Sequence, residues 1–334
     1  MKKLLIIPAL FFLGCSNKDV FIPKNPKTAK LQSKTQAKEL YDYTKKTLTF
    51  RELDLVYEKP KSFIDDGAWG RYFYYTKEGK KLGKFKLVND DIAVNGDKLL
   101  LIKENKLITL PYLVLNASRE GNFVAIMFEN NAMGIYDLNA DSLIFYRPTQ
   151  EVLSVKYLSQ EPVFYHDLVL FPLLDGNVGV YDLRAKKYLN TINVSEGVIN
   201  NNIIFMKIVN DQLFIATPNK LILFNPNFLI DYKADIKHVV TDGKYLYLFL
   251  VNGKIVKLDS NLKKIKEVDL KFADYFAPSF CNGDIYTVTK RGYFIKITPD
   301  LDTTVYEGTK FDTDNPLRIK ECKIYNDNKV FFIE

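Results

Sequence analysis

Few side chains in the 334-residue chain are of the types that perform nucleophilic or metal chemistry. A nucleophilic or metal site needs clustered His or Cys; His166 and His238 are the only histidines and lie far apart, so we expect surface or sheet residues. The run DTDN at 312–315 alternates oxygen ligands, as calcium favours, but lacks the glycine and distant glutamate of an EF loop. We expect it, like Asp65-Asp66, to form a turn. The sequence predicts no catalytic residue, cofactor or metal.

Three cysteines offer a different chemistry, because thiols form disulfides or accept lipids. Cys281 and Cys322 each precede a strand-like run in consecutive repeats, so they could lie near each other. An exported compartment permits a disulfide between them. Two buried free thiols are the other interpretation. The sequence leaves this choice open.

The first residues predict export and lipidation. Lys2 and Lys3 are followed by a short apolar run, Leu4 to Phe12, that is too short to span a bilayer. The segment LFFLGC, ending at Cys15, resembles the lipobox of bacterial lipoproteins. That resemblance implies a signal peptide over 1–14 and diacylglyceryl addition to the Cys15 thiol. Ser16, in place of aspartate, implies the outer membrane facing the periplasm; the inner membrane and the cell surface are the alternatives.

Residues 15–68 are expected to carry the lipidated cysteine, a tether and a short helix. The polar stretch from Ser16 to Thr28 contains Pro23 and Pro26, which is typical of a flexible tether. Residues 29–46 are rich in helix formers, so we predict one short helix there.

A strand–turn–strand unit recurs from Trp69 to the end of the chain and predicts the fold. The units span 98–116, 123–148, 168–194, 212–232, 245–270 and 284–308. One more short apolar strand lies upstream of most units, so each unit supplies about four strands. Repeats of this kind predict an all-β propeller over 69–334. The half-units at 70–88 and 323–334 are expected to pair and close the ring. This count gives seven blades, with eight as the alternative and a parallel β-helix as the competing fold.

Each unit ends its second strand with an apolar residue followed by Asp or Asn. Tyr136-Asp137, Tyr181-Asp182, Phe224-Asn225 and Leu258-Asp259 are the examples. We expect the polar side chain to bond backbone N–H groups of the following turn and its apolar neighbour to pack between blades. The pair is therefore interpreted as a structural device, and any function is expected where the repeats differ.

The repeats resemble two propeller families. GIYDL (134–138) and GVYDL (179–183) look like the strand end of WD40 repeats, although the Gly-His pair of that family is missing. Glycine, apolar alternation and Asp before a polar turn look more like the quinoprotein-type repeat. Together with the lipobox, the chain is similar to BamB-type lipoproteins, whose propellers have eight blades. That resemblance implies a non-enzymatic scaffold binding envelope or outer-membrane proteins during assembly.

Charge and composition argue against nucleic-acid binding and leave two alternative functions. The net charge of +7 is interspersed, with no dense basic run among aromatics, so no nucleic-acid partner is expected. A quinone-dependent enzyme is disfavoured because the chain has one tryptophan, Trp69. We expect a monomeric propeller within a complex. The alternatives are a propeller hydrolase or lyase acting on a sugar or lactone, and a surface adhesin or carbohydrate binder.

Overall fold

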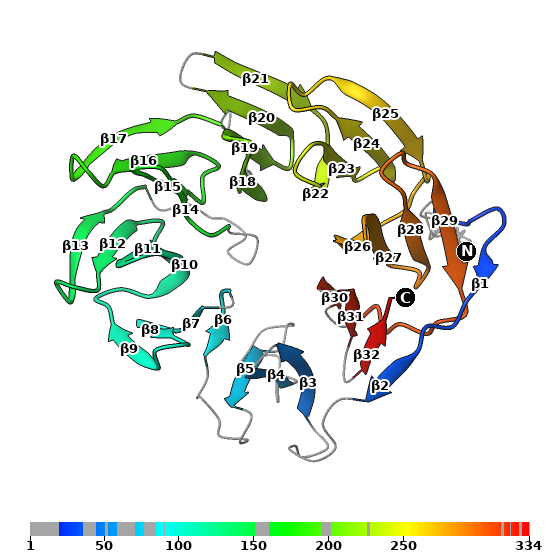
Figure 1. The fold of residues 1–334 in the computed structure, drawn as a ribbon, viewed down its shortest axis with the longest axis horizontal. Helices are drawn as coiled ribbons and strands as arrows, with labels where there is room; N and C mark the ends of the chain where they lie inside the picture. Colours follow the sequence, from blue (N-terminus) through cyan, green and yellow to red (C-terminus); the bar gives the residue numbers. More distant parts are fainter. Residues whose placement is uncertain are drawn as a thin grey trace, which may run out of the picture.

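The described strands form eight sheets arranged around a ring (Figure 1). The computed structural model describes residues 20–35, 45–50, 53–58, 71–76, 85–89, 91–150, 160–194, 202–225, 228–314, 317–320, 322–326 and 329–333. Within these ranges no helix has the length and apolarity needed to cross a bilayer. The all-β propeller prediction is confirmed. The predicted count of seven blades is wrong, and the alternative of eight is correct.

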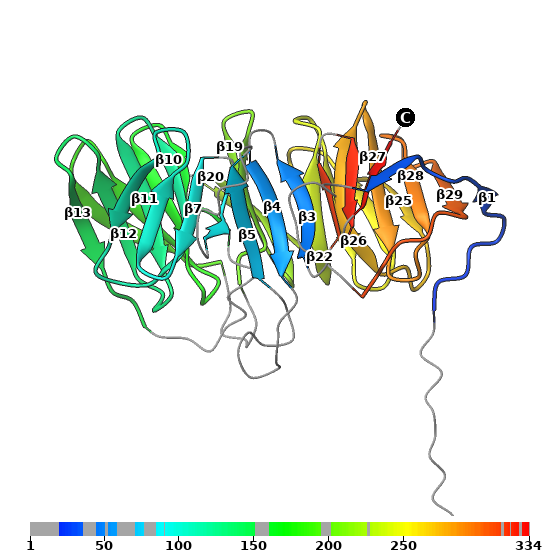
Figure 2. The ribbon, with the colours of Figure 1, turned by 90° about the horizontal axis from the view of Figure 1, so that it is seen from below.

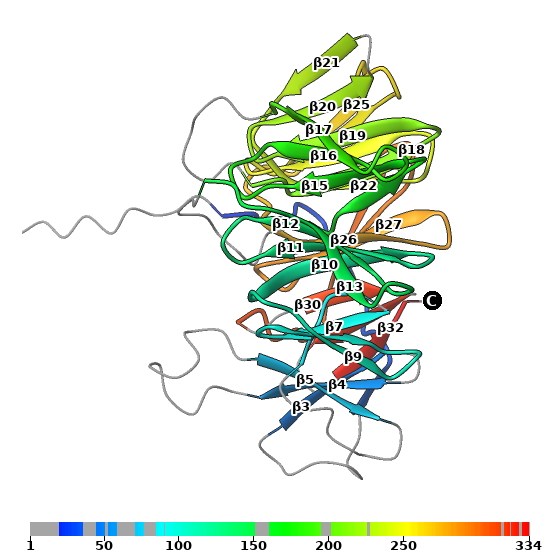
Figure 3. The ribbon, with the colours of Figure 1, turned by 90° about the vertical axis from the view of Figure 1, so that its left-hand side faces the viewer.

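Six consecutive sheets each contain four antiparallel strands (Figures 1 and 3), and the last of the six also pairs with a fifth, parallel strand from the N-terminal segment. The first three are β6 (Lys86–Leu87), β7 (Ile92–Asn95), β8 (Lys98–Leu101) and β9 (Lys106–Thr109); β10 (Val114–Glu120), β11 (Phe123–Phe128), β12 (Met133–Asp137) and β13 (Ser142–Arg147); and β14 (Val163–Tyr165), β15 (Leu168–Pro172), β16 (Val178–Asp182) and β17 (Lys187–Ile192). The next three are β18 (Phe205–Val209), β19 (Gln212–Thr217), β20 (Lys220–Asn225) and β21 (Phe228–Lys233); β22 (Ile236–Thr241), β23 (Leu246–Leu250), β24 (Lys254–Leu258) and β25 (Lys264–Asp269); and β26 (Tyr275–Cys281), β27 (Asp284–Thr289), β28 (Phe294–Ile297) and β29 (Thr303–Glu307).

The remaining sheets use strands from both ends of the chain. One sheet contains β3 (Lys45–Phe50), β4 (Leu53–Glu58) and β5 (Arg71–Thr76). The last sheet contains β30 (Leu317–Lys320), β31 (Lys323–Asn326) and β32 (Lys329–Phe332), with β2 (Ser33–Thr35) antiparallel to β32. A further short strand, β1 (Lys27–Thr28), lies parallel to β29.

The ring therefore closes through terminal strands, as predicted, but through a different N-terminal strand. The segment 70–88 was expected to complete the last blade; instead β5 pairs with β4 and β6 with β7. The partner of β32 is β2, whose sequence SKT is too short and polar to stand out as a strand. The helix predicted over 29–46 is also wrong for its described part, because 29–35 is extended and contains β2. The seven-blade count missed strands β3 and β4, which form a separate sheet with β5.

The sequence of each strand reflects its place in the blade. Two of the second strands, β11 (FVAIMF) and β23 (LYLFL), are continuous apolar runs because both of their faces are covered, and β23 is buried throughout. The outermost strand β25, KIKEVD, is almost entirely exposed and highly charged, which protects an open edge from pairing with other chains. In the described part of the ring, apolar side chains of adjacent blades meet in buried clusters, for example Tyr181 of β16 among residues of the preceding blade.

The repeated Asp turn behaves as expected. Asp137 Oδ1 accepts the backbone N–H of Asn139 at 2.9 Å, and Asp182 Oδ1 accepts that of Ala185 at 2.7 Å. The strand register shifts just before each of these aspartates, so one β-bulge recurs at the same point of the blade. Tyr181 is 3% exposed and packs against Phe145 of the neighbouring blade, with ring centroids 4.3 Å apart. The pair is structural, as predicted.

Candidate functional site at the closure of the ring

The N-terminal segment runs across the outside of the last two described blades and fastens them together. Figure 1 shows it passing from β1, beside β29, to β2, beside β32, and Figure 2 shows β1 at the rim of the ring. Backbone bonds fix it at both ends: Ala29 N donates to Glu307 O at 2.8 Å, and Phe332 N donates to Gln32 O at 3.0 Å. Between them Leu31 N donates to Thr309 Oγ1 at 2.9 Å. We call residues 27–35 the strap.

A disulfide joins the same two blades on their inner side. Cys281 ends β26, the first strand of its blade, and Cys322 lies in the turn between β30 and β31. The structure joins their Sγ atoms, with Cα atoms 5.1 Å apart. The covalent bond and the strap therefore hold one blade contact from both sides. We call this contact the seam.

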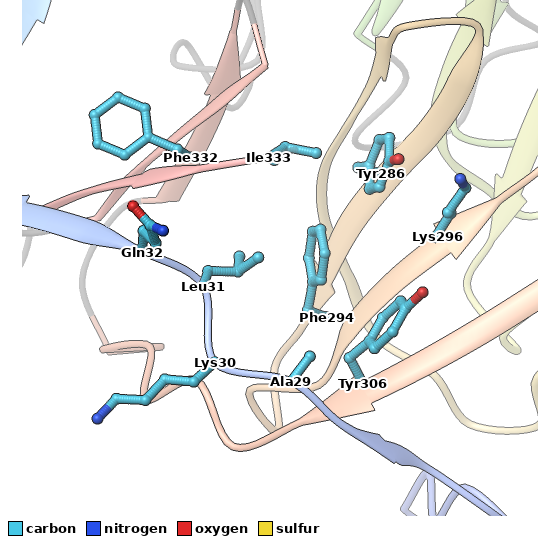
Figure 4. A pocket seen from close by; sticks show the side chains of 10 residues that line it. All are labelled: Ala29, Lys30, Leu31, Gln32, Tyr286, Phe294, Lys296, Tyr306, Phe332 and Ile333. Atoms are coloured by element: carbon cyan, nitrogen blue, oxygen red, sulfur yellow. The ribbon is translucent and has the colours of Figure 1, made fainter.

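A pocket of about 400 Å³ lies in the seam beneath the strap (Figure 4). Three aromatic rings form one wall: Tyr286 and Phe294 stack with centroids 5.4 Å apart, and Phe294 is 5.9 Å from Tyr306. The strap supplies Ala29 and Leu31, which point toward this wall in Figure 4. The volume is within the range of small-ligand sites. The full lining comprises Ala29, Lys30, Leu31, Gln32, Tyr286, Phe294, Lys296, Tyr306, Phe332 and Ile333.

Lys296 is the charged group on the inner wall of the pocket. Its Nζ lies 2.7 Å from Asp284 Oδ2 and 5.9 Å from the centroid of the Tyr286 ring. The hydrogen bond to Asp284, followed by the interaction with Tyr286, raises the pKa of the Lys296 ammonium. Asp284 therefore holds Lys296 in its cationic form, and the pocket offers aromatic surface beside this positive charge. Such a lining suits an apolar or aromatic side chain with a nearby acceptor.

The two histidines stay apart and form no site together. His166 is 70% exposed in its side chain, and its Nε2 pairs with Asp211 Oδ1 at 2.9 Å in a surface turn. His238, in β22, donates from Nε2 to the carbonyl oxygen of Tyr275 at 3.1 Å. Burial lowers the pKa of His238 to about 4, so its imidazole is neutral at pH 7. Both positions agree with the expectation of structural histidines.

The acidic turn at 312–314 is held by protein groups. Asn326 Oδ1 accepts the backbone N–H of Asp312 at 2.7 Å, and Asp312 Oδ1 accepts that of Asp314 at 3.2 Å. Among the described residues no group of three or more His, Cys, Asp or Glu is placed to hold a metal ion. The lipidation candidate Cys15 and the Asp65-Asp66 pair lie outside the described residues.

The innermost strands of seven of the sheets are β6, β10, β14, β18, β22, β26 and β30 (Figure 1). By sequence these strands contain one carboxylate, that of Glu120. They contain six basic residues, Lys86, Arg119, Lys207, Lys237, Arg318 and Lys320. A glycosidase needs two carboxylates on either side of the scissile bond, and these strands do not supply a pair.

Sequence reasoning did not find the pocket. Its aromatic residues belong to strands that look like every other blade strand, and its strap was predicted as tether and helix. The available signal was weak: Tyr286, Phe294 and Tyr306 give one unit three aromatics in successive strands. Strap residues contribute to the pocket only through pairings that span about 280 positions of sequence, such as Leu31 with Thr309.

Comparisons with known proteins define the fold and identify proteins of similar sequence. No known family model matches the chain. It is 26% identical over 239 residues to the plasminogen-binding protein PgbB of Helicobacter pylori strain J99, covering 69% of this chain and 44% of that protein. The PgbB of strain 26695 is 25% identical over 245 residues, with the same coverage. The chain thus spans less than half the length of the curated relatives it matches.

Solved structures resemble the chain over most of its length. BamB from Moraxella catarrhalis superposes with a TM-score of 0.60 at 16% identity, covering 90% of this chain and 98% of BamB. A computationally designed protein, Ika8, gives 0.59 at 11% identity, with coverages of 88% and 98%. The C-terminal WD40 domain of Sif2 gives 0.57 at 11% identity, with coverages of 85% and 90%. The chain has a BamB-like β-propeller fold, as the sequence resemblance implied.

Proposed function

We propose that the protein is a lipid-anchored propeller that binds a protein partner at the seam and has no catalytic activity of its own. The observation that carries this proposal is the aromatic pocket beneath the strap, with a volume of about 400 Å³. Buried aromatic anchors in a preformed pocket are typical of the centres of protein interfaces. The blades outside the seam supply a rigid disc that presents this pocket.

The binding mode follows from the lining. An extended segment of the partner would run beside the strap and insert one apolar or aromatic side chain between Leu31 and Phe294. Lys296, held by Asp284, would lie beside the inserted group and favour a backbone carbonyl or carboxylate there. Extended partners commonly bind to sheet edges in this way, and β1 on β29 shows that this blade accepts an added strand.

The proposed address is the outer membrane, through lipid on Cys15, with the propeller facing the periplasm. The lipobox supports this localisation. Envelope or outer-membrane proteins are the partners that a protein anchored there could reach. The fold shared with BamB is consistent with a role in outer-membrane protein assembly. Cys15→Ala should abolish incorporation of a labelled acyl chain in cells; labelling that persists in this variant would contradict lipidation at Cys15.

A second candidate is binding of an extracellular protein from the cell surface. The similarity to plasminogen-binding proteins over 69% of the chain favours it. Plasminogen is then the first ligand to test. Antibody or protease access on intact cells separates the candidates, because only a surface-displayed propeller would be reached.

Photo-crosslinking in living cells tests the proposal. A photoreactive amino acid replaces Lys30, an exposed strap residue at the pocket rim, and in a control it replaces Leu189 on β17. We expect one protein to be trapped from position 30 and not from position 189. Equal trapping from both positions, or none from position 30 across growth conditions, would contradict binding at the seam.

A further inference from the structure

An exposed apolar corner lies where the N-terminal segment first meets the propeller. Ile22 is 76% exposed, Val251 is 64% exposed, and Val20 and Phe272 are each 36% exposed. These side chains come from three separate segments: the stretch before β1, the turn between β23 and β24, and the connection from β25 to β26. Exposed apolar side chains that gather in one place mark a surface that binds a partner or a membrane.

Buried contacts join the three segments, because Phe21 packs in one apolar cluster with Leu270 and Ala273. Phe21 is 7% exposed and meets the ring of Tyr293 edge-on, with centroids 5.7 Å apart. Phe272 N donates to Asn252 O at 3.1 Å, so the connection rests on the β23–β24 turn. Gly253 makes this fit: its φ is +92°, and a Cβ there would lie 2.4 Å from Leu270 O. We call the surface of Val20, Ile22, Val251 and Phe272 the anchor corner.

Positive charges surround the anchor corner. Lys24, Lys271, Lys290 and Arg291 are exposed around it, and Lys271 Nζ lies 5.0 Å from the centroid of the Phe272 ring. The acidic residues nearby are Asp235, Asp269 and Asp274, all exposed, and Asp274 is paired with Lys237. Apolar tips ringed by Lys and Arg are the pattern of surfaces that enter the interface of anionic bilayers.

The position of Cys15 gives the second argument. Cys15 precedes Val20 by five residues. Chain geometry then limits their separation to about 18 Å, since each residue spans at most 3.6 Å. Phe21 and the strap are docked on the propeller. A lipid on Cys15 would therefore hold the anchor corner close to the bilayer surface and restrict the orientation of the propeller.

We propose that the anchor corner inserts into the head-group region of an anionic bilayer and fixes the tilt of the propeller on the membrane. The inference rests on the proposed lipidation of Cys15, and it goes beyond that proposal by assigning the membrane-contacting surface. Ile22 and Val251 enter the interface, while the four surrounding cations contact lipid phosphates. The seam pocket is then presented at a constant height above the membrane.

The test measures the depth of single probes on the lipidated full-length protein. With Cys15 acylated and Cys281 bonded to Cys322, Ile22→Cys or Val251→Cys supplies one free thiol for a fluorescent label. Leu189→Cys, an exposed apolar position on β17, is the matched control. The proteins are reconstituted into vesicles of phosphatidylcholine with phosphatidylglycerol, with and without brominated acyl chains.

We expect brominated lipid to quench the labels at positions 22 and 251 and to leave the label at 189 bright. Lys271→Glu combined with Arg291→Glu should reduce quenching at 22. Vesicle-bound protein with labels at 22 and 251 as bright as the label at 189 would overturn the anchor corner alone. Labels at 22 and 251 that are shielded from iodide in cells, but are not quenched by brominated lipid, would indicate that a protein partner covers the anchor corner. That result would overturn the proposed membrane contact as well. Protein that fails to float with vesicles, with an unmodified Cys15, would overturn the lipidation itself.

Discussion

The Asp turns of the blades and the seam show two ways of joining strands in one ring. Each turn is local: Asp182 bonds an N–H three residues away, and an equivalent Asp137 serves another blade. The seam is non-local, because β2 pairs with β32 and Cys281 bonds to Cys322. Repetition makes the turns interchangeable, whereas the seam occurs once. The difference teaches that the unique contact, rather than the repeated motif, is where a binding site can evolve without disturbing the other blades.

The largest effect is expected from removal of the disulfide. The double variant Cys281→Ala, Cys322→Ala removes a cross-link between residues separated by 41 positions in the sequence. The entropy of closing a loop of that length predicts a loss of about 4 kcal/mol in the free energy of unfolding. Urea titration followed by circular dichroism measures this loss. Wild-type protein in reductant is the control and should show the same loss. A change below about 1 kcal/mol would mean that the seam is held by packing alone.

Acid should destabilise the blade contact beside the seam through His238. The pKa of His238 is lowered to about 4 when folded, mainly by burial, whereas the unfolded imidazole has its ordinary value of 6.5. The unfolded state therefore binds more protons between these values, and stability falls as the pH drops from 7 to 4, by up to about 3 kcal/mol. Urea titrations across this range measure the slope. His238→Gln should flatten it, and an unchanged slope would exclude His238 as its source.

Release of the N-terminal segment should have a smaller, local effect. Phe21→Ala removes a buried ring and should cost about 2 to 3 kcal/mol of docking free energy, the value of burying one such side chain. Hydrogen exchange at the amides of Ala29 and Leu31 reports on it, because both are bonded in the strap. Ile22→Ala, at a side chain that is 76% exposed, is the control and should leave exchange unchanged. Equal protection in both variants would show that the strap holds without Phe21.

The smallest effect is expected in a repeated turn. Asp182→Ala removes the acceptor of one backbone N–H and should lower stability by about 1 kcal/mol. Its effect should match that of Asp137→Ala, because the two turns are equivalent, and thermal unfolding measures both. A loss of several kcal/mol in only one of them would break the equivalence of the repeats.

The sequence predicted what depends on local pattern. Alternating apolar residues in β16 and β17 and the Tyr181-Asp182 turn were sufficient for the propeller fold, although not for the number of its blades. The strap could not be predicted, because SKT of β2 has no strand signal and forms only when β32 is beside it. The pocket depends on the strap, so it was hidden as well. The Cys281–Cys322 pair was left open for the same reason: its two partners are brought together by tertiary structure.

Filling the pocket tests most directly whether the seam is the binding site. Ala29 lines the pocket from the strap, so Ala29→Trp should fill it while the strap's backbone bonds remain; Ala29→Ser is the matched control. Partners recovered with each variant from crosslinked, solubilised membranes are quantified by mass spectrometry. We predict that the amount of the principal partner recovered with Ala29→Trp falls at least about tenfold, as expected for a lost anchor contact. Recovery with Ala29→Ser should equal that with the unaltered protein. Full recovery with Ala29→Trp, in protein of unchanged stability, would contradict the account.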